Sequence, residues 1–290
     1  TACSSVMGVI IPPSIMMIVW GGLMSVSIGG LFLAGMVPGI LIALFMMGTV
    51  LVYAKTRNYP IYKRASLIEF FQAFGKSVLA LVTPTIIVGG IIGGLFTPTE
   101  ASVVAVLYSA FLGGIIYRAI GPKQFPKVLY DSARLSAISL FCIGTASAFG
   151  WLLAYYRVPQ SLVDIVAAYG NGIITTGFII ALSFLVIGMF IDAIPAIIIL
   201  GTILLPLAEK AGMHPIHFAI VGIISLAFGL VTPPYGLCLL ISCSVGEIAV
   251  SKVLKDVAIF LLPLLLLLGL TIVFPEIVLF LPRWLAPEFL

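Results

Sequence analysis

Two apolar stretches of the chain carry the same pattern of residues, Ser-x-x-x-Gly-x-x-x-Pro-Pro. The first runs from Ser4 to Pro13 and the second from Ser225 to Pro234. Adjacent prolines inside a helix remove two backbone donors and clash with the preceding turn, while glycine lets the chain turn sharply. Each stretch therefore predicts two half-helices joined by an extended break. At membrane depth, the polar backbone groups that a break frees are tolerated only inside protein or beside a polar cavity.

The two predicted breaks offer hard oxygen ligands suited to Na⁺. Each break frees backbone carbonyls, beginning with that of Gly8 in the first and that of Gly229 in the second, and Ser14 and Thr232 add hydroxyls. These four residues are the expected Na⁺ ligands. The half-helices after the prolines present amides and a positive dipole end to an anion. A structural proline kink is the alternative, but the recurrence of the motif favours a site. The full expected sodium and substrate set at the breaks is Ser5, Gly8, Pro12, Pro13, Ser14, Gly229, Thr232, Pro233, Pro234 and Gly236, with Ser4 and Ser225 as further hydroxyls.

Asp192 is an acidic residue well inside an apolar stretch. A carboxylate within a membrane is costly, so it usually faces a cavity, a cation or a partner. Gly188 precedes it and Pro195 follows, which predicts a hairpin with Asp192 at its tip. We therefore add Gly188 and Asp192 to the expected site. The alternative is a hydrated carboxylate near the membrane surface.

Other reactive side chains give weaker indications. Glu100, in the run Thr97-Pro98-Thr99-Glu100, suits either a helix cap or a functional role. His214 and His217 flank Pro215 without a third ligand type, so no metal centre is expected there, and the cysteines are expected to be small buried hydrophobes. Sequence sets typical of a hydrolase triad, a Walker loop or a dinucleotide fold are absent, so an enzyme is not expected.

The elements that must position these residues are membrane helices. Of the 290 residues, 62% are hydrophobic and only 8% are charged, and the mean hydropathy is +1.30. A soluble domain carries about a quarter charged residues, so this composition predicts a polytopic, all-α membrane protein. The net charge of +4 comes from basic residues in short loops, which indicates topology rather than nucleic-acid binding.

The order of apolar runs predicts the architecture. A short amphipathic piece, 66–76, follows a basic loop, has helical apolar spacing and is expected to lie in the membrane interface. The expected elements are a broken helix at 5–26, helices at 31–53, 77–96, 99–119 and 135–156, a re-entrant hairpin at 172–208 whose second arm spans only 196–208, a second broken helix at 215–241 and a last helix at 257–281.

Loop charges predict the orientation of these elements. If the basic loops after the second and fourth runs are cytoplasmic, Lys252 and Lys255 also fall inside, as the positive-inside rule expects. The two broken helices then cross in opposite directions. That arrangement is an inverted repeat, which is typical of secondary transporters with sites on discontinuous helices. By symmetry, a second hairpin is expected upstream of Thr1, and the chain is expected to be the C-terminal part of a longer protein lacking its N-terminal part.

Five stretches have recognisable patterns: 8–14, 96–101, 148–153, 188–192 and 229–236. Together and in this order they resemble one known family, the large membrane subunit of TRAP (tripartite ATP-independent periplasmic) transporters, and the likeness covers essentially the whole chain. The resemblance implies an elevator-type, Na⁺-driven importer of organic acids such as sialic acid or C4-dicarboxylates in the bacterial inner membrane. It also implies a small membrane subunit and a periplasmic binding protein as partners, Na⁺ as the coupling ion and no other cofactor. An ion channel or pore subunit built on broken helices is the alternative function.

Overall fold

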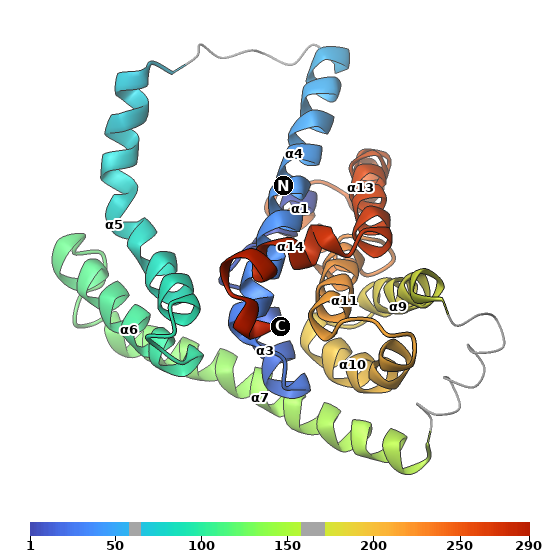
Figure 1. Ribbon diagram of the computed structural model, residues 1–290. Coiled ribbons are helices and arrows are strands. Elements are labelled where there is room, and N and C mark those ends of the chain that lie inside the picture. The colour runs from blue at the N-terminus through green and yellow to red at the C-terminus, as the bar shows by residue number, and fades with distance from the viewer. Residues whose placement is uncertain (58–64, 158–171) are drawn as a thin grey trace. The chain divides into compact units, whose positions relative to one another are not determined.

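The computed structural model describes residues 1–57, 65–157 and 172–290, and within these ranges the chain contains helices and no strands. It divides into two compact units, one formed by residues 1–49 and 139–290 and the other by residues 50–138 (Figure 1). Two long helices, α4 (Ile28–Arg57) and α7 (Phe125–Tyr155), contribute residues to both units. All the residues expected at the breaks and the hairpin tip belong to the first unit.

The centre of the first unit is α11 (Pro215–Gly229), whose residues are buried along almost its whole length. Around it pack α9 (Ile173–Gly188), α10 (Ala193–Lys210), α13 (Val250–Val273) and α14 (Glu276–Leu285) (Figure 1). The remaining elements of this unit are short: α1 (Ala2–Ser5), α2 (Met7–Ile10), α3 (Ile15–Met24), α12 (Leu237–Val245) and a 3-10 turn at Pro287–Phe289.

An aromatic cluster fixes the packing of three of these helices. Trp20 of α3 lies 5.5 Å from Phe184 of α9 and 5.2 Å from Phe218 of α11, measured between ring centroids. Gly222 makes the approach of α3 to α11 possible, because a Cβ atom there would lie 2.5 Å from the Trp20 ring. All three rings are fully or almost fully buried. Aromatic pairs at these distances stabilise packing beyond their burial alone.

The second unit is built on a pair of helices, α5 (Leu67–Ile92) and α6 (Pro98–Phe111), which continues as a π-helical turn at Leu112–Ile116. Each helix begins with a capping box, Ser66 with Glu69 in α5 and Thr97 with Glu100 in α6. The Tyr108 hydroxyl of α6 also donates to the Leu79 carbonyl of α5, over 2.9 Å. Of the two roles left open for Glu100, the structure therefore shows the cap.

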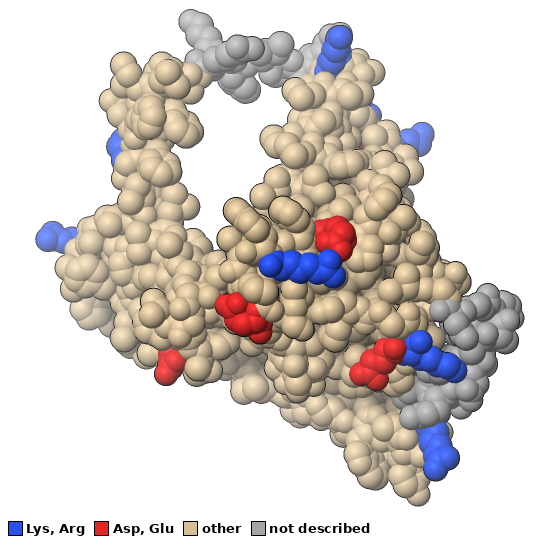
Figure 2. All heavy atoms as spheres, viewed as in Figure 1, with Lys and Arg blue, Asp and Glu red and all other residues tan. Residues whose placement is uncertain are grey.

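Six helices in the described residues are long and apolar enough to cross a bilayer, and the bent pair formed by α1–α2 and α3 makes a seventh candidate. The six are α4, α5, α6 with its π-helical turn, α7, α10 and α13. Figure 2 shows how sparse charged side chains are on the viewed face. The fold is thus that of an all-α, multi-pass membrane protein, as the composition predicts.

Several element boundaries differ from the expected ones. The stretch 66–76 is not a separate interfacial piece, because its capping box starts α5 and the helix runs on unbroken. The last helix is split by Phe274 and Pro275 into α13 and α14. The second hairpin arm has 18 residues rather than 13, because α10 begins directly after Asp192 and continues past Pro206. That length is enough to cross a bilayer, so the re-entrant path of this hairpin stays a prediction.

Candidate functional site

The first broken helix is interrupted between Ile10 and Ile15, with a bend of 44° between its halves. Ile11 and Ser14 have extended backbone angles, and the two prolines lie between them. In a continuous helix the amides at these proline positions would bond the carbonyls of Gly8 and Val9. The Ser14 hydroxyl takes over part of this role, since it donates to the Val9 carbonyl and accepts from the Met17 amide, 3.4 Å away. Ser14 is buried and both closes the break and caps α3.

The second broken helix stops at Gly229 and resumes at Leu237. Its prolines leave the carbonyls of Gly229 and Leu230 without their helical donors. Two other amides replace them: Thr232 N lies 2.9 Å from the Gly229 oxygen, and Cys238 N lies 3.0 Å from the Leu230 oxygen. The Thr232 hydroxyl donates to the Phe228 carbonyl over 2.7 Å, which leaves its oxygen lone pairs available to a cation.

The two breaks share their local geometry and lie in one packed unit. The peptide bond between the two prolines is cis in both. α1 packs against α12, while α2 and α3 pack against α11. The first half of each broken helix therefore contacts the second half of the other: α1 meets α12, and α3 meets α11. Two segments that run antiparallel pair in this way. Gly236, in the left-handed region at φ 45°, starts the second half of the later helix.

The hairpin between α9 and α10 meets the second break backbone to backbone. A Cβ atom added at Gly229 would lie 2.7 Å from the Leu185 oxygen and 2.8 Å from the Gly188 Cα atom. Beside this contact, the Tyr235 amide donates to the Met189 carbonyl at 3.3 Å. Small residues at membrane helix interfaces allow such close approach. The structure thus brings Gly188, Gly229 and the turn at Pro233–Gly236 together.

Asp192 lies at the N-cap position of α10, three residues after Met189. Its carboxylate is exposed and does not cap the helix, although its carbonyl accepts from the Ala196 amide at 3.2 Å. The predicted position at the connection between the two helices is therefore observed. Its predicted role toward an ion or substrate stays a prediction.

Some of the proposed hydroxyls do not face the breaks. Ser225 is fully buried and donates to the Val221 carbonyl within its own helix. Ser4 and Ser5 likewise donate to carbonyls one turn back, those of Thr1 and Ala2. Ser5 and Gly8 are nonetheless exposed, and no atom outside the local helix lies within 4 Å of a Cβ built at Gly8.

The backbone partners that complete the site were not expected from the sequence. They are the carbonyls of Val9, Phe228 and Met189 and the amides of Cys238 and Tyr235. Every residue has a backbone carbonyl and every residue except proline has an amide N–H, so no sequence signal singles these groups out. In the described residues, no cluster of three or more His, Cys, Asp or Glu side chains could hold a metal ion, and His217 instead bonds the Thr271 carbonyl at 2.8 Å.

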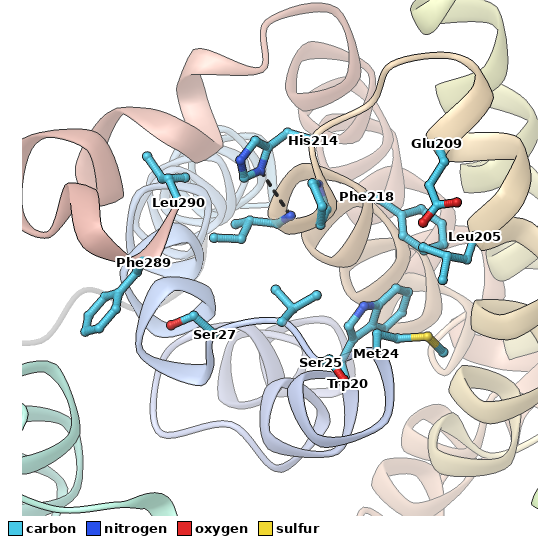
Figure 3. Close-up of a pocket in the computed structure, with 13 residues that line it drawn as sticks. Trp20, Met24, Ser25, Ser27, Leu205, Glu209, His214, Phe218, Phe289 and Leu290 are labelled. Carbon is cyan, nitrogen blue, oxygen red and sulfur yellow. Dashed lines mark hydrogen bonds between the residues drawn. The ribbon is translucent and has the colours of Figure 1, made fainter.

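A separate cavity of about 220 Å³ lies at the opposite ends of α3 and α11 from the breaks (Figure 3). Figure 3 shows Trp20, Met24 and Phe218 on one side of it and Phe289 on the other. Among the described residues, the buried Trp20 indole nitrogen has no hydrogen-bond acceptor. The lining includes the Glu209 carboxylate and neither Lys nor Arg, so its charge does not suit an organic anion.

Comparison with known proteins identifies the family. Residues 1–277 match the model of the tripartite ATP-independent periplasmic transporter, DctM component. The sialic acid TRAP transporter large permease protein SiaM of Vibrio cholerae and the C4-dicarboxylate TRAP transporter large permease protein DctM of Pseudomonas aeruginosa are each 35% identical, over 98% and 97% of this chain. The 2,3-diketo-L-gulonate TRAP transporter large permease protein YiaN of Escherichia coli is 31% identical over 98% of the chain.

The chain spans about two thirds of the length of these relatives, 66% of SiaM and DctM and 67% of YiaN. All three are named as permeases rather than enzymes, and their named substrates differ. The family match and the apolar helices indicate a multi-pass protein of the bacterial inner membrane. The chain belongs to the DctM family, the large permease component of TRAP transporters.

Proposed function

We propose that the protein of which this chain is part carries an organic acid across the inner membrane together with Na⁺. The observation that supports this most is the pair of broken helices. In the first, the Ser14 hydroxyl lies against the proline-freed Val9 carbonyl, and in the second, the Thr232 hydroxyl bonds the Phe228 carbonyl, one residue before the proline-freed carbonyl of Gly229. Unwound carbonyls bind coupling cations in other secondary transporters with inverted repeats, and half-helix N-termini face their anionic substrates. Relatives named for sialic acid, C4-dicarboxylate and 2,3-diketo-L-gulonate transport support an organic acid as the substrate class.

The proposed sodium ligands are the carbonyls of Gly8 and Gly229 and the hydroxyls of Ser14 and Thr232. Gly188, Asp192 and Gly236 would shape the surrounding cavity, with the four break prolines. The proposed partners are a small TRAP membrane subunit and a periplasmic binding protein, which would deliver the substrate. An elevator movement of the first unit belongs to the same proposal. The open face at Ser5 and Gly8 supports a further hairpin that packs there, as α9 packs at Gly229.

The test is uptake into proteoliposomes that contain the full-length subunit, the small subunit and the binding protein. We expect saturable uptake that disappears when the Na⁺ gradient is collapsed. Thr232→Ala should raise the Na⁺ concentration for half-maximal uptake by a factor of about ten to one hundred, since a polar contact to a charged group contributes about 1.5 to 3 kcal/mol. Thr49→Ala is the matched control, because Thr49 donates to the carbonyl one turn back in the same way, at 2.8 Å, but on α4. Unsaturable flux, or identical Na⁺ curves for both variants, would contradict the proposal.

A further inference from the structure

The last helix, α14, is too short to cross the membrane and does not end inside the protein core. Its ten residues, Glu276–Leu285, measure about 15 Å, half of the roughly 30 Å hydrocarbon thickness. It follows the membrane-crossing helix α13 after Phe274 and Pro275. The candidate span therefore ends at Val273, and the chain turns into a separate short helix.

The surface of α14 is divided into three sectors. The first sector is buried and consists of Val278, Leu279 and Pro282. The helix α14 packs against α11. A second sector is charged, because Arg283 and Glu276 form a salt bridge with both side chains more than half exposed.

The third sector is apolar and exposed. The Phe280 ring is 57% exposed and Trp284 is 71% exposed, and the two rings stack at an interplanar angle of 14°. Leu285 extends the same sector at 51% exposure. At about 100° per residue, this sector lies between the buried sector and the charged one.

We propose that α14 lies flat in the headgroup region of the bilayer, with Phe280 and Trp284 toward the lipid and the Glu276–Arg283 pair toward water. Short helices with one apolar and one charged exposed face bind in this zone, and aromatic rings, Trp above all, are enriched there. Leu262 and Leu266 of α13 and then Phe274 are also largely exposed, as expected of apolar side chains that face lipid. By the charge of the loops, this interface is the one opposite Lys252 and Lys255.

This placement of α14 would also hold in position the residues that follow it. The tail that follows carries Phe289 back against α4, where a Cβ atom at Gly29 would lie 2.9 Å from the Phe289 ring. Phe289 and Leu290 also line the cavity beside Trp20. An α14 held at the lipid surface would therefore keep this tail over the cavity.

A nitroxide scan of the full-length subunit in phospholipid nanodiscs tests the proposal. After replacement of the native cysteines, labels are placed one at a time at positions 276, 280, 283 and 284, with position 266 on α13 as the deep reference. Collision rates with oxygen, which partitions into lipid, and with a water-soluble nickel complex give the depth of each label. We expect positions 280 and 284 to favour oxygen and to lie shallower than 266, while 276 and 283 favour nickel.

Two results would overturn the proposal. Nickel access at 280 and 284 would place α14 in water, and shielding of both sites from both reagents would mean that protein covers them, either an upstream segment of the subunit or a partner. A second measurement needs no label: brominated lipids should quench tryptophan emission less in Trp284→Phe than in the parent. Trp20→Phe should leave the quenched component unchanged, because Trp20 is fully buried.

Discussion

The contact between Gly229 and the hairpin predicts that Gly229→Ala destabilises the subunit. The added Cβ would lie 2.7 Å from the Leu185 oxygen and 2.8 Å from the Gly188 Cα atom. Both are backbone atoms, so no side-chain rotation relieves the overlap and α9 must move away from α11. Overpacking of this kind costs about 1 to 3 kcal/mol, which works against a gain of up to about 1 kcal/mol from replacing glycine by alanine in a helix.

The assay is the midpoint of thermal unfolding of the purified full-length subunit, followed by the exposure of its buried cysteines, Cys3 and Cys243. Gly48→Ala is the matched control, since Gly48 is within helix α4 and has open space where its Cβ would be. We expect Gly229→Ala to unfold several degrees below the control. Equal midpoints for the two variants would refute the close backbone packing. Gly8→Ala tests the proposed inverted repeat. If a hairpin packs on Gly8 in the full-length protein, this variant should lower the midpoint of thermal unfolding as much as Gly229→Ala does.

Three further predictions concern single side chains. Ser14→Ala should lower the unfolding free energy by about 1 kcal/mol, measured by denaturant titration against Ser4→Ala, because only Ser14 caps α3. Asp192→Asn should abolish proteoliposome uptake while membrane insertion stays normal; uptake equal to the parent at every Na⁺ concentration would make Asp192 a surface residue. Burial and Arg283 lower the pKa of His214 below its ordinary value of 6.5, so the unfolded state takes up the proton first and stability should fall as the pH drops below 6.5. His214→Gln should flatten that part of the stability profile, and an unchanged slope would exclude His214 as its source.

The proline pairs made the two breaks predictable, because two missing donors in succession cannot be repaired within one helical turn. Single prolines did not give the same information. Pro38 and Pro84 lie inside continuous helices, whereas Pro275 follows a break that separates α13 from α14. One lost hydrogen bond is tolerated in a membrane helix when neighbours satisfy the freed group, and that depends on tertiary contacts that the local sequence does not contain.

The site was predictable in its residue types but not in its partners. Ser14 and Thr232 were recognisable because a hydroxyl beside a proline pair is an available oxygen ligand. The contact of Gly188 with Gly229 joins residues far apart in sequence, and its closeness depends on backbone atoms alone. Ser225 shows the opposite limit, because it has the same motif position as Ser4 and both hydroxyls donate to a carbonyl one turn back in the chain rather than facing a break.

The backbone contact at Gly188 also sets where the hairpin can bend. Since Gly188 touches Gly229 and the Tyr235 amide bonds the Met189 carbonyl, the chain up to Met189 is fastened to the second broken helix. The amides of Phe190 and Ile191 still bond the Ile187 carbonyl, each at 2.9 Å, so a bend would begin at Asp192, which is exposed. A pivot at this point would displace the Asp192 carboxylate and leave the oxygens around Thr232 undisturbed.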